Sequence, residues 1–287
     1  MIAQLRERFR SAPAPTPAPS SVVLRGVSVG VLTDISAVIQ PGACVGIIGI
    51  NGAGKSTLLA AAAGVLRPDA GSITGTANAV YLPEGFRGDA NISVRRWLGI
   101  ARFLPGWNPE IGGALIKQMG LPPRVPVRGL SQGQRLRLGL ILTLGRDASC
   151  YLLDDPFLGL DPVARAHAER WISRRAEGAT ILLAAQDAEV VERLCTDLLL
   201  LNGGRVTGWG AMEAWRGRFV AIRTVGGGAA LSAIDGCILQ RRTRGETDDL
   251  ILDDPDGQVR ALLATAGVRF QPSPLRLDEL IAALVSP

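Results

Sequence analysis

The chain has 287 residues, 47% of them hydrophobic, and a formal net charge of +5 at pH 7, a length that allows one large domain and a smaller second unit. No apolar run approaches the roughly 18 residues of a membrane-spanning helix, and the first ten residues lack a signal peptide's apolar core, so we expect a soluble, cytoplasmic protein. Because no basic run with interleaved aromatics accompanies the positive charge, we expect no nucleic-acid partner.

Residues 1–20 are predicted to form a tail and a linker ahead of the first domain. Ile2, Leu5 and Phe9 stand at helical spacing with arginines between them, which would suit a short interfacial helix. Ten residues seldom hold a helix alone, so we expect a frayed tail instead. The following APAPTPAPS predicts an extended, polyproline-type linker.

An alternating pattern of strands and helices begins at Ser21. Strands are predicted for residues 22–29 and 31–39, and a Pro-Gly turn separates them from a buried strand at residues 43–49. A helix is predicted to follow from Lys55 to Val65. This order of elements indicates an α/β fold.

The character of the chain changes twice more. Residues 91–129, punctuated by glycine and proline, are predicted to be an inserted helical subdomain. Helices and strands then alternate again until about Phe219, where a triple glycine, a polar stretch and two amphipathic helical patterns follow. We therefore predict a first domain of residues 21–218 and a small α/β accessory domain of residues 219–287.

Two groups of potential metal ligands are predicted to bind no metal. The cysteines lack CxxC spacing and stand singly in mostly apolar contexts, which predicts free buried thiols. The four are Cys44, Cys150, Cys195 and Cys237. The acidic patch of the accessory domain lacks the glycine and bidentate glutamate of an EF-hand, which predicts a solvated turn. It consists of Asp248, Asp249, Asp253 and Asp254.

The segment GINGAGKST, residues 49–57, contains the phosphate-binding pattern GxxxxGK[ST] between a predicted strand and a predicted helix, the context that this motif requires. Its glycines let successive backbone N–H groups point at one phosphate, and the helix start adds partial positive charge. Lys55 is predicted to reach the β- and γ-phosphates, Ser56 to hold Mg²⁺ and Thr57 to bond a phosphate oxygen. The predicted binding residues are Gly49, Asn51, Gly52, Ala53, Gly54, Lys55, Ser56 and Thr57.

A second motif is the hydrophobic strand YLLD, which ends on Asp154. A strand that ends there places this carboxylate beside the phosphate loop, where it can anchor Mg²⁺ through water. ATP and Mg²⁺ are therefore the predicted cofactors, with Ser56 and Asp154 as metal-binding residues.

Four ordered motifs resemble those of the ATP-binding-cassette (ABC) superfamily. Besides the phosphate loop, LSQGQ at residues 130–134 resembles the LSGGQ signature, and Leu160-Asp161 resembles the D-loop. YLPE at residues 81–84 stands where the family has its Q-loop, with Glu84 in place of glutamine. The resemblance covers about residues 22–217. It implies a P-loop NTPase fold of the ABC type with a helical subdomain.

The resemblance also implies partners. ABC cassettes form head-to-tail dimers in which each ATP lies between one phosphate loop and the partner's signature. Ser131, Gly133 and Gln134 would then contact the nucleotide of a second ABC ATPase subunit, identical or different. Glu84 would contribute to the Mg²⁺ site and to catalysis. An integral membrane permease subunit would dock near residues 84–97, which would hold the chain at the cytoplasmic face of the cell membrane.

Two predicted catalytic residues depart from the family pattern. The family's glutamate after the strand aspartate is here Asp155, whose carboxylate is withdrawn by roughly 1.5 Å. A displacement of ~1 Å can cost about 10²-fold in rate. The family's switch histidine is here Gln186, which can donate a hydrogen bond but can neither carry positive charge nor shuttle a proton. The only histidine, His167, is predicted to lie at the surface of another helix.

A third departure concerns adenine. Residues 22–35 contain no aromatic side chain where the family stacks the base. Such stacking is worth ~1–3 kcal/mol per base, so we expect weaker nucleotide binding unless an apolar side chain covers the ring. Val29 and Val31 are the candidates.

Three interpretations remain open. YLPE, FLPGWNPE and SPLRLDELIAAL resemble ATPases of ABC-2-type exporters, and the Asp155–Gln186 pairing resembles the degenerate half of asymmetric exporters. The leading prediction is therefore an ATP-binding exporter subunit with weakened hydrolysis, working opposite a more competent cassette. The second is a symmetric, slow homodimer in which Asp155 is an adequate base. The third is a soluble, nucleotide-gated regulatory or scaffold protein without a membrane partner.

Overall fold

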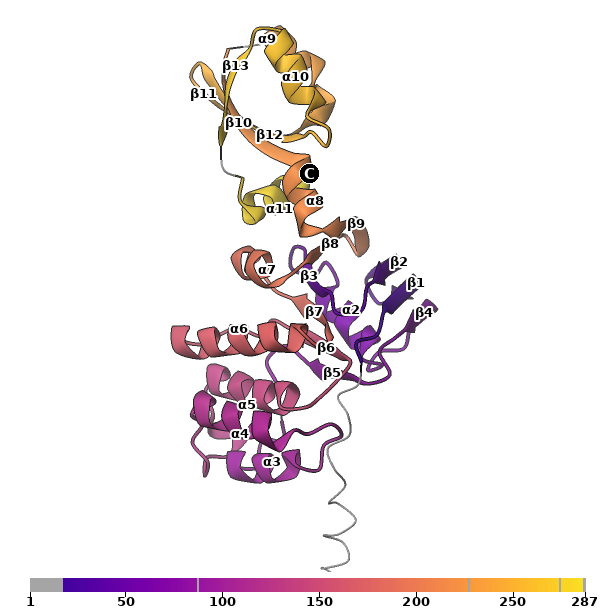
Figure 1. The fold of residues 1–287 in the computed structure, drawn as a ribbon, viewed down its shortest axis with the longest axis vertical. Coiled ribbons are helices and arrows are strands. Elements are labelled where there is room, and N and C mark those ends of the chain that lie inside the picture. The colour runs from indigo at the N-terminus through magenta and orange to yellow at the C-terminus, as the bar shows by residue number, and fades with distance from the viewer. Residues whose placement is uncertain (1–17, 87, 227, 274, 286–287) are drawn as a thin grey trace, which may run out of the picture.

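The computed structural model describes residues 18–285 apart from residues 87, 227 and 274. The predicted frayed tail and most of the proline-rich linker lie outside the described residues. The molecule is elongated, with a bundle of helices at one end and a small sheet at the other (Figure 1). No helix within the described residues is long and apolar enough to cross a membrane.

A six-stranded sheet forms the centre of the molecule. Its strands, in spatial order, are β5 (Ala79–Leu82), β6 (Cys150–Asp154), β7 (Thr180–Ala184), β3 (Cys44–Ile48), β8 (Asp197–Asn202) and β9 (Arg205–Ala211). Neighbouring strands are parallel except for the antiparallel β8–β9 pair. Strands β3, β6 and β7 are buried at every position, because both faces of the sheet are covered, and they accordingly consist of unbroken apolar runs.

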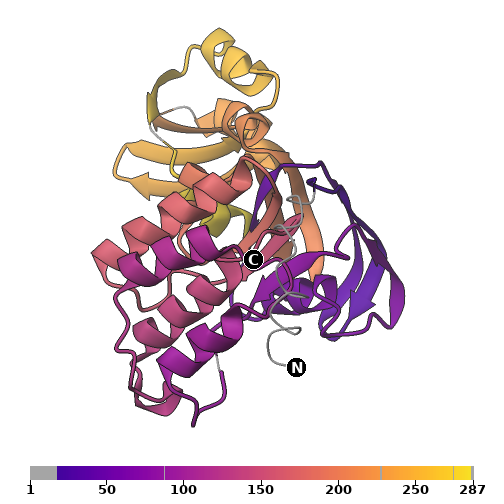
Figure 2. The same cartoon turned by 60° about the horizontal axis from the view of Figure 1, so that its bottom comes forward.

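Different layers cover the two faces of this sheet. Three helices pack on one face: α5 (Gln132–Leu144), α6 (Pro162–Ala176) and α7 (Ala188–Leu194). The other face carries α2 (Lys55–Ala62) and an antiparallel sheet of β2 (Leu32–Ile39), β1 (Val22–Val29) and β4 (Ala70–Thr74). Figure 2 shows these two layers on opposite sides of the central strands. The loops that follow β3, β6 and β7 converge, because the carboxyl ends of adjacent parallel strands meet at one edge.

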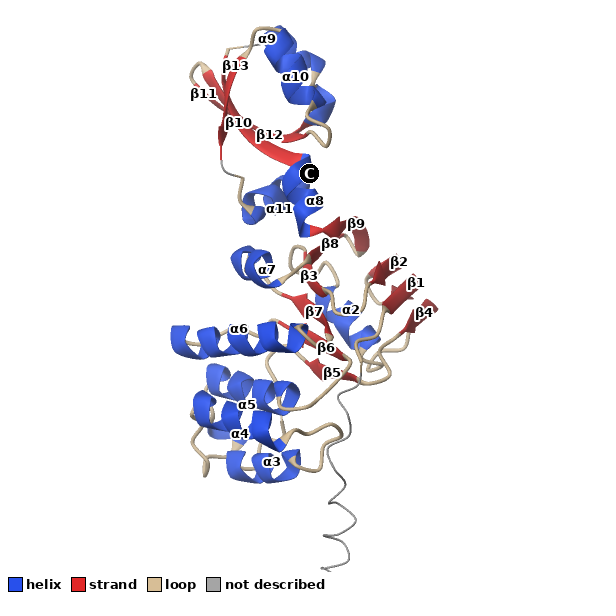
Figure 3. Ribbon diagram, in the orientation of Figure 1, coloured by secondary structure: helices blue, strands red, loops and turns tan. Residues whose placement is uncertain are grey.

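The predicted helical segment 91–129 contains α3 (Val94–Ala101), α4 (Pro109–Met119) and the 3-10 turn η1 (Val127–Gly129). Ser93 and Asn108 cap the two helices with side-chain oxygens, the usual role of these residues at an N-cap. A small core of its own joins α3 and η1 to α5, whereas Leu115 and Met119 of α4 pack into the large core. Figure 3 shows the resulting group of helices beside α6.

One helix boundary was predicted wrongly. Helix α2 ends at Ala62 rather than Val65. Gly64 adopts a left-handed φ of 72°, and the N–H groups of Val65 and Leu66 both donate to Ala60. A left-handed glycine of this kind ends a helix.

Helix α8 (Met212–Arg218), whose Met212 and Trp215 are buried in the large core, leads into the C-terminal part, which forms a second α/β unit. Its antiparallel sheet has the order β11 (Ile238–Arg244), β12 (Thr247–Asp253), β10 (Phe219–Val225) and β13 (Arg269–Ser273). The remaining elements are α9 (Gly228–Ala233), η2 (Asp235–Cys237), α10 (Gln258–Thr265) and α11 (Leu277–Val285). Residues of α9 and α10 share a small core with one face of the sheet. Helix α11 instead packs against α7 and joins the core of the first unit (Figure 1).

The prediction of a solvated turn for the four aspartates is wrong. Three of them lie on β12, and each of the four pairs with an arginine. The pairs are Asp248–Arg241 at 2.8 Å, Asp249–Arg223 at 2.6 Å, Asp253–Arg218 at 2.6 Å and Asp254–Arg260 at 2.7 Å. Arg218 and Arg223 are distant in the sequence and reach β12 through strand pairing, whereas Arg241 and Arg260 are only seven and six residues from their partners. Of the four cysteines, all free thiols, three are buried as predicted and Cys237 is half-buried.

Candidate nucleotide-binding site

The phosphate loop follows β3 at the carboxyl edge of the central sheet and leads directly into α2. Gly52 and Gly54 have φ angles of 82° and 104°, left-handed conformations that glycine adopts readily. Gly49 has no room for a side chain, because a Cβ there would lie 2.2 Å from the Leu201 carbonyl oxygen. Lys55 Nζ donates to the Gly49 carbonyl at 2.8 Å. The loop therefore combines the curled backbone and the cation that a phosphate group requires.

Ser56 and Asp154 meet beside this loop. Ser56 Oγ donates to Asp154 Oδ1 at 3.1 Å, and Asp154 is only 1% exposed. The pKa of Asp154 is raised to about 6, chiefly by burial. The hydrogen bond from Ser56 opposes this increase, and the nearby Asp155 and Glu84 carboxylates add to it. A divalent cation here would relieve that repulsion, and hydroxyl and carboxylate oxygens are ligands that Mg²⁺ accepts. These residues therefore fit a Mg²⁺ ion.

That ion would need ligands besides the side chains. Among the described residues, no group of three or more histidine, cysteine, aspartate or glutamate side chains is arranged to hold a metal. Mg²⁺ commonly uses one or two protein oxygens and completes its shell with water and substrate phosphates. Ser56 and Asp154 match that pattern.

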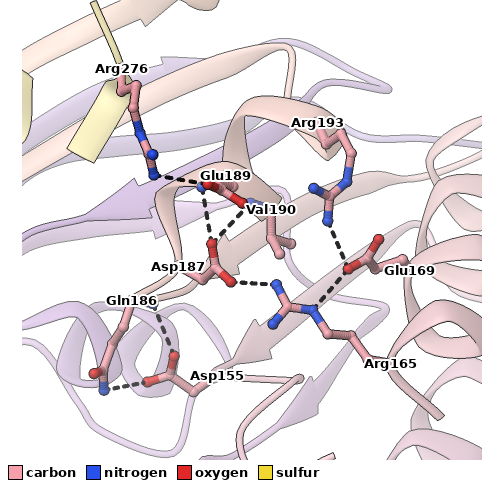
Figure 4. Close-up of polar contacts among 9 residues, drawn as sticks. All are labelled: Asp155, Arg165, Glu169, Gln186, Asp187, Glu189, Val190, Arg193 and Arg276. Atoms are coloured by element: carbon pink, nitrogen blue, oxygen red, sulfur yellow. Dashed lines mark hydrogen bonds and ion pairs between the residues drawn. The ribbon is translucent and has the colours of Figure 1, made fainter. Parts of the chain in front are cut away.

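Asp155 and Gln186 form a hydrogen-bonded pair (Figure 4). The Gln186 backbone N–H donates to Asp155 Oδ1 at 3.2 Å, and its side-chain Nε2 donates to Oδ2 at 3.3 Å. Asp155 is 9% exposed and has a φ of 45°, a left-handed conformation that aspartate tolerates better than most residues. Its own N–H donates to the Ala184 carbonyl on β7 at 2.9 Å. The carboxylate is thus fixed in place by the residue at the switch position.

The phosphate loop, Asp155 and Gln186 share one pocket of about 400 Å³, a volume typical of small-molecule sites. Residues from five separate segments line it: Val31, Asn51, Gly52, Gly54, Lys55, Ser56, Thr57, Glu84, Asp155 and Gln186. Two of the binding residues predicted in the phosphate loop are not among these lining residues, and neither is Asp154, which accepts the hydrogen bond from Ser56. Ala53 is buried beneath the loop, and Gly49 contributes its carbonyl to Lys55.

The structure separates the two valines considered for the adenine position. Val29 is 7% exposed and belongs to the core between the two sheets. Val31 is 56% exposed and lines the pocket. Only Val31 is therefore placed to cover a base.

The signature residues lie apart from this pocket, at the start of α5. Ser131 Oγ accepts the Gln134 N–H at 3.2 Å, and the Gln134 side chain accepts the Ser131 N–H at 3.0 Å, which makes a capping box. Because Oγ acts as an acceptor in this box, its O–H can still donate to another group. Gly133 packs so closely that a Cβ would lie 2.3 Å from the Gly159 carbonyl oxygen.

Two residues that the motifs did not indicate adjoin the site. Asp187 follows Gln186, caps α7 and accepts a hydrogen bond from Arg165 of α6 (Figure 4). An aspartate just before a helical pattern is a recognisable N-cap signal, whereas nothing near Arg165 indicates its partner.

His167, on the same helix as Arg165, is half-buried rather than exposed and does not line the pocket.

Comparisons with known proteins bear on this geometry. The ABC transporter family model matches residues 32–100. The chain is 32% identical over 279 residues to the "Nod factor export ATP-binding protein I" of Burkholderia pseudomallei (strain 1710b), covering 88% of this chain and 91% of that protein. It is 30% identical to the protein of the same name from Rhizobium etli, covering 88% of each.

Two further proteins, one of them a solved structure, are also similar to this chain. The "ABC-type transporter ATP-binding protein EcsA" of Bacillus subtilis is 28% identical over 209 residues, covering 66% of this chain and 84% of that protein. A solved ATP-binding subunit of an ABC transporter superposes with a TM-score of 0.62 at 25% identity, covering 69% of this chain and 92% of that one. The α/β fold predicted from the motifs is thereby confirmed. The chain belongs to the ABC transporter family, as an ATP-binding subunit.

Proposed function

We propose that this chain powers an ABC-2-type exporter, binding MgATP at an interface between two cassettes and hydrolysing it slowly or opposite a more competent cassette. The Asp155–Gln186 pair beside a complete phosphate loop carries this proposal. Two relatives bear the name of Nod factor export proteins, which supports export as the direction of transport.

The binding half of the reaction rests on residues of this chain. The phosphate loop would hold the β- and γ-phosphates through its N–H groups and Lys55, and Thr57 would bond a phosphate oxygen. Ser56, Asp154 and the nearby Glu84 would hold Mg²⁺, which neutralises charge on the phosphates.

The hydrolytic half rests on Asp155. A carboxylate at this position orients the attacking water and accepts its proton. Here both carboxylate oxygens accept hydrogen bonds from Gln186, and the side chain is one methylene shorter than glutamate. Gln186 can steady the carboxylate and a phosphate oxygen, but it cannot take up a proton. Binding with slow turnover follows from this combination.

The partners would occupy two separate surfaces. Ser131, Gly133 and Gln134 would contact nucleotide held by a second ABC ATPase subunit, identical or different. The permease subunit would dock on the helical subdomain near residues 84–97. Just beyond this segment, Ile100 in the last turn of α3 and Phe103 after it expose 37% and 66% of their surface. In this arrangement residues 21–218 are the nucleotide-binding domain, residues 219–287 are an accessory domain, and the chain sits at the cytoplasmic face of the cell membrane.

Steady-state ATPase rates of the full-length chain test this function. The wild type is compared with Asp155→Glu/Gln186→His, and Lys55→Ala serves as the blank. A wild type near the blank that rises in the double variant supports a detuned site. A wild type well above the blank and unimproved by the change would instead support a symmetric homodimer. Recovery of a tagged chain from mild detergent without any integral membrane protein would contradict the permease partner.

A further inference from the structure

Helix α7 links the switch residue to the rest of the molecule. It is only seven residues long, and a single residue, Asp187, separates Gln186 from its first residue, Ala188. Helices this short are marginal by themselves, so tertiary contacts set the position of α7. A shift of α7 therefore moves Gln186, because only one residue lies between them, and Gln186 in turn moves the Asp155 carboxylate to which it is hydrogen-bonded.

One set of these contacts comes from α6. Asp187 Oδ1 accepts the N–H groups of Glu189 and Val190, which caps α7, while Oδ2 accepts from Arg165 (Figure 4). Arg165 Nε also donates to Glu169 at 3.1 Å. The cap of α7 is therefore shared with a neighbouring helix.

The last turn of α7 returns to the same acid. Arg193 Nη2 donates to Glu169 Oε1 at 2.9 Å, the oxygen that also accepts from Arg165. Both ends of α7 are thus hydrogen-bonded to α6. The N-cap of α6 is the D-loop residue Asp161.

The second set of contacts comes from the C-terminal unit. Arg276 Nη2 donates to Glu189 Oε1, in the first turn of α7, at 2.8 Å (Figure 4). Arg276 directly precedes α11, whose Leu277 and Leu280 are buried in the core shared with α7. The C-terminal unit therefore contacts the helix that follows the switch residue.

We propose that Arg165 of α6 and Arg276 of the C-terminal unit are positioning residues for the Gln186–Asp155 pair, acting through Asp187, Glu189 and helix α7. Neither arginine lines the nucleotide pocket, so neither is a catalytic residue. Their role rests on the ATP hydrolysis proposed above. It makes the C-terminal unit part of the machinery that sets the hydrolysis rate.

The two arginines differ in how firmly they hold α7. The side chains of Arg276 and Glu189 are 58% and 62% exposed. Exposed ion pairs contribute little to stability, so losing this one should shift the equilibrium between the held and the released position of α7 by at most about fivefold. The Arg165 network is less exposed and has more charge-assisted bonds, which are about twice as strong as neutral ones. We therefore expect Arg165→Ala to have the larger effect.

The experiment compares three full-length variants by ATPase kinetics and by hydrogen–deuterium exchange of the peptide that contains Gln186. In Arg276→Ala we expect kcat to fall about three- to fivefold and the peptide to exchange faster by the same factor. Both measurements report the same equilibrium between the held and the released position of α7. In Arg165→Ala we expect about tenfold in both. The Kd for MgATP and the melting temperature should stay near the wild-type values, and Arg276→Lys should recover most of the lost rate.

Arg223→Ala is the matched control. It removes an arginine of similar exposure, paired with Asp249 at 2.6 Å, from the same C-terminal unit but away from α7. The inference is overturned if kcat and exchange in Arg276→Ala and Arg165→Ala match this control, or if kcat rises. If no variant and not even the wild type exceeds Lys55→Ala in turnover, the proposed ATPase function fails. The exchange rates then still decide whether the two arginines hold the switch loop.

Discussion

Gln186 binds both carboxylate oxygens of Asp155, one through its backbone N–H at 3.2 Å and the other through its side-chain amide at 3.3 Å. The left-handed φ of 45° at Asp155 suits an aspartate better than most side chains. The two departures from the family pattern therefore form one hydrogen-bonded unit. They are best studied as a pair.

Gln186→Ala tests that unit. The variant removes one of the two hydrogen bonds to Asp155 and leaves the phosphate loop untouched. We expect turnover to fall about tenfold, because the carboxylate loses its orientation. The free energy of unfolding should fall by about 1 kcal/mol, and the Kd for MgATP should rise by less than about tenfold, because Gln186 supplies at most one hydrogen bond to a phosphate oxygen. ATPase assays, nucleotide titration and thermal unfolding measure these quantities.

The double variant Asp155→Ala/Gln186→Ala provides the control. Residues that act as a unit show non-additive effects, so the double variant should lose no more turnover than Asp155→Ala alone. Losses that multiply would mean that the two residues act independently.

Asp154→Asn should stabilise the nucleotide-free protein. The folded-state pKa of about 6 lies above the usual 3.8, so this aspartate's contribution to stability is fully present below about pH 4 and is lost as the pH rises through 6. We expect the variant to gain roughly 1–3 kcal/mol above pH 6 and nothing below about pH 4. Mg²⁺-dependent ATP binding should be lost at the same time. Urea unfolding across this pH range would refute the idea if the gain did not depend on pH.

Gly133→Ala should disturb the signature against the D-loop. A Cβ at this position would lie 2.3 Å from the Gly159 carbonyl, so we expect a loss of about 1–3 kcal/mol. Gly113→Ala is the matched control, since a Cβ on this exposed residue of α4 meets nothing within 4 Å. It should gain about 0.5–1 kcal/mol from helix propensity. Chemical denaturation of both variants checks the opposite signs.

Asp254→Asn should weaken the C-terminal unit in a pH-dependent way. Burial raises the pKa of Asp254, but hydrogen bonds from Arg260 and from the Val259 N–H lower it more, so its pKa lies below the usual value. Its stabilisation is present above about pH 4 and is lost as the pH falls through the folded-state pKa. We expect the variant to lose about 1–3 kcal/mol at neutral pH and much less at about pH 3. Equal losses at both values would contradict this assignment.

The amino-acid sequence by itself determined the parts of the site that depend on local backbone chemistry. The phosphate loop and the Ser131 capping box are set by residues that neighbour one another in the chain, so spacing alone identifies them. The buried strand that ends on Asp154 is equally local, because apolar runs of this length form the centre of a parallel sheet.

The tertiary structure decided which distant residues meet. Strand order brings Glu84, Asp155 and Gln186 into one pocket, and it selects Val31 over Val29. Strand pairing gives Asp249 of the supposed solvated turn its partner Arg223, and the packing of α11 brings Arg276 to Glu189. Such contacts depend on register and helix packing, which join residues far apart in the chain, and no local pattern encodes them.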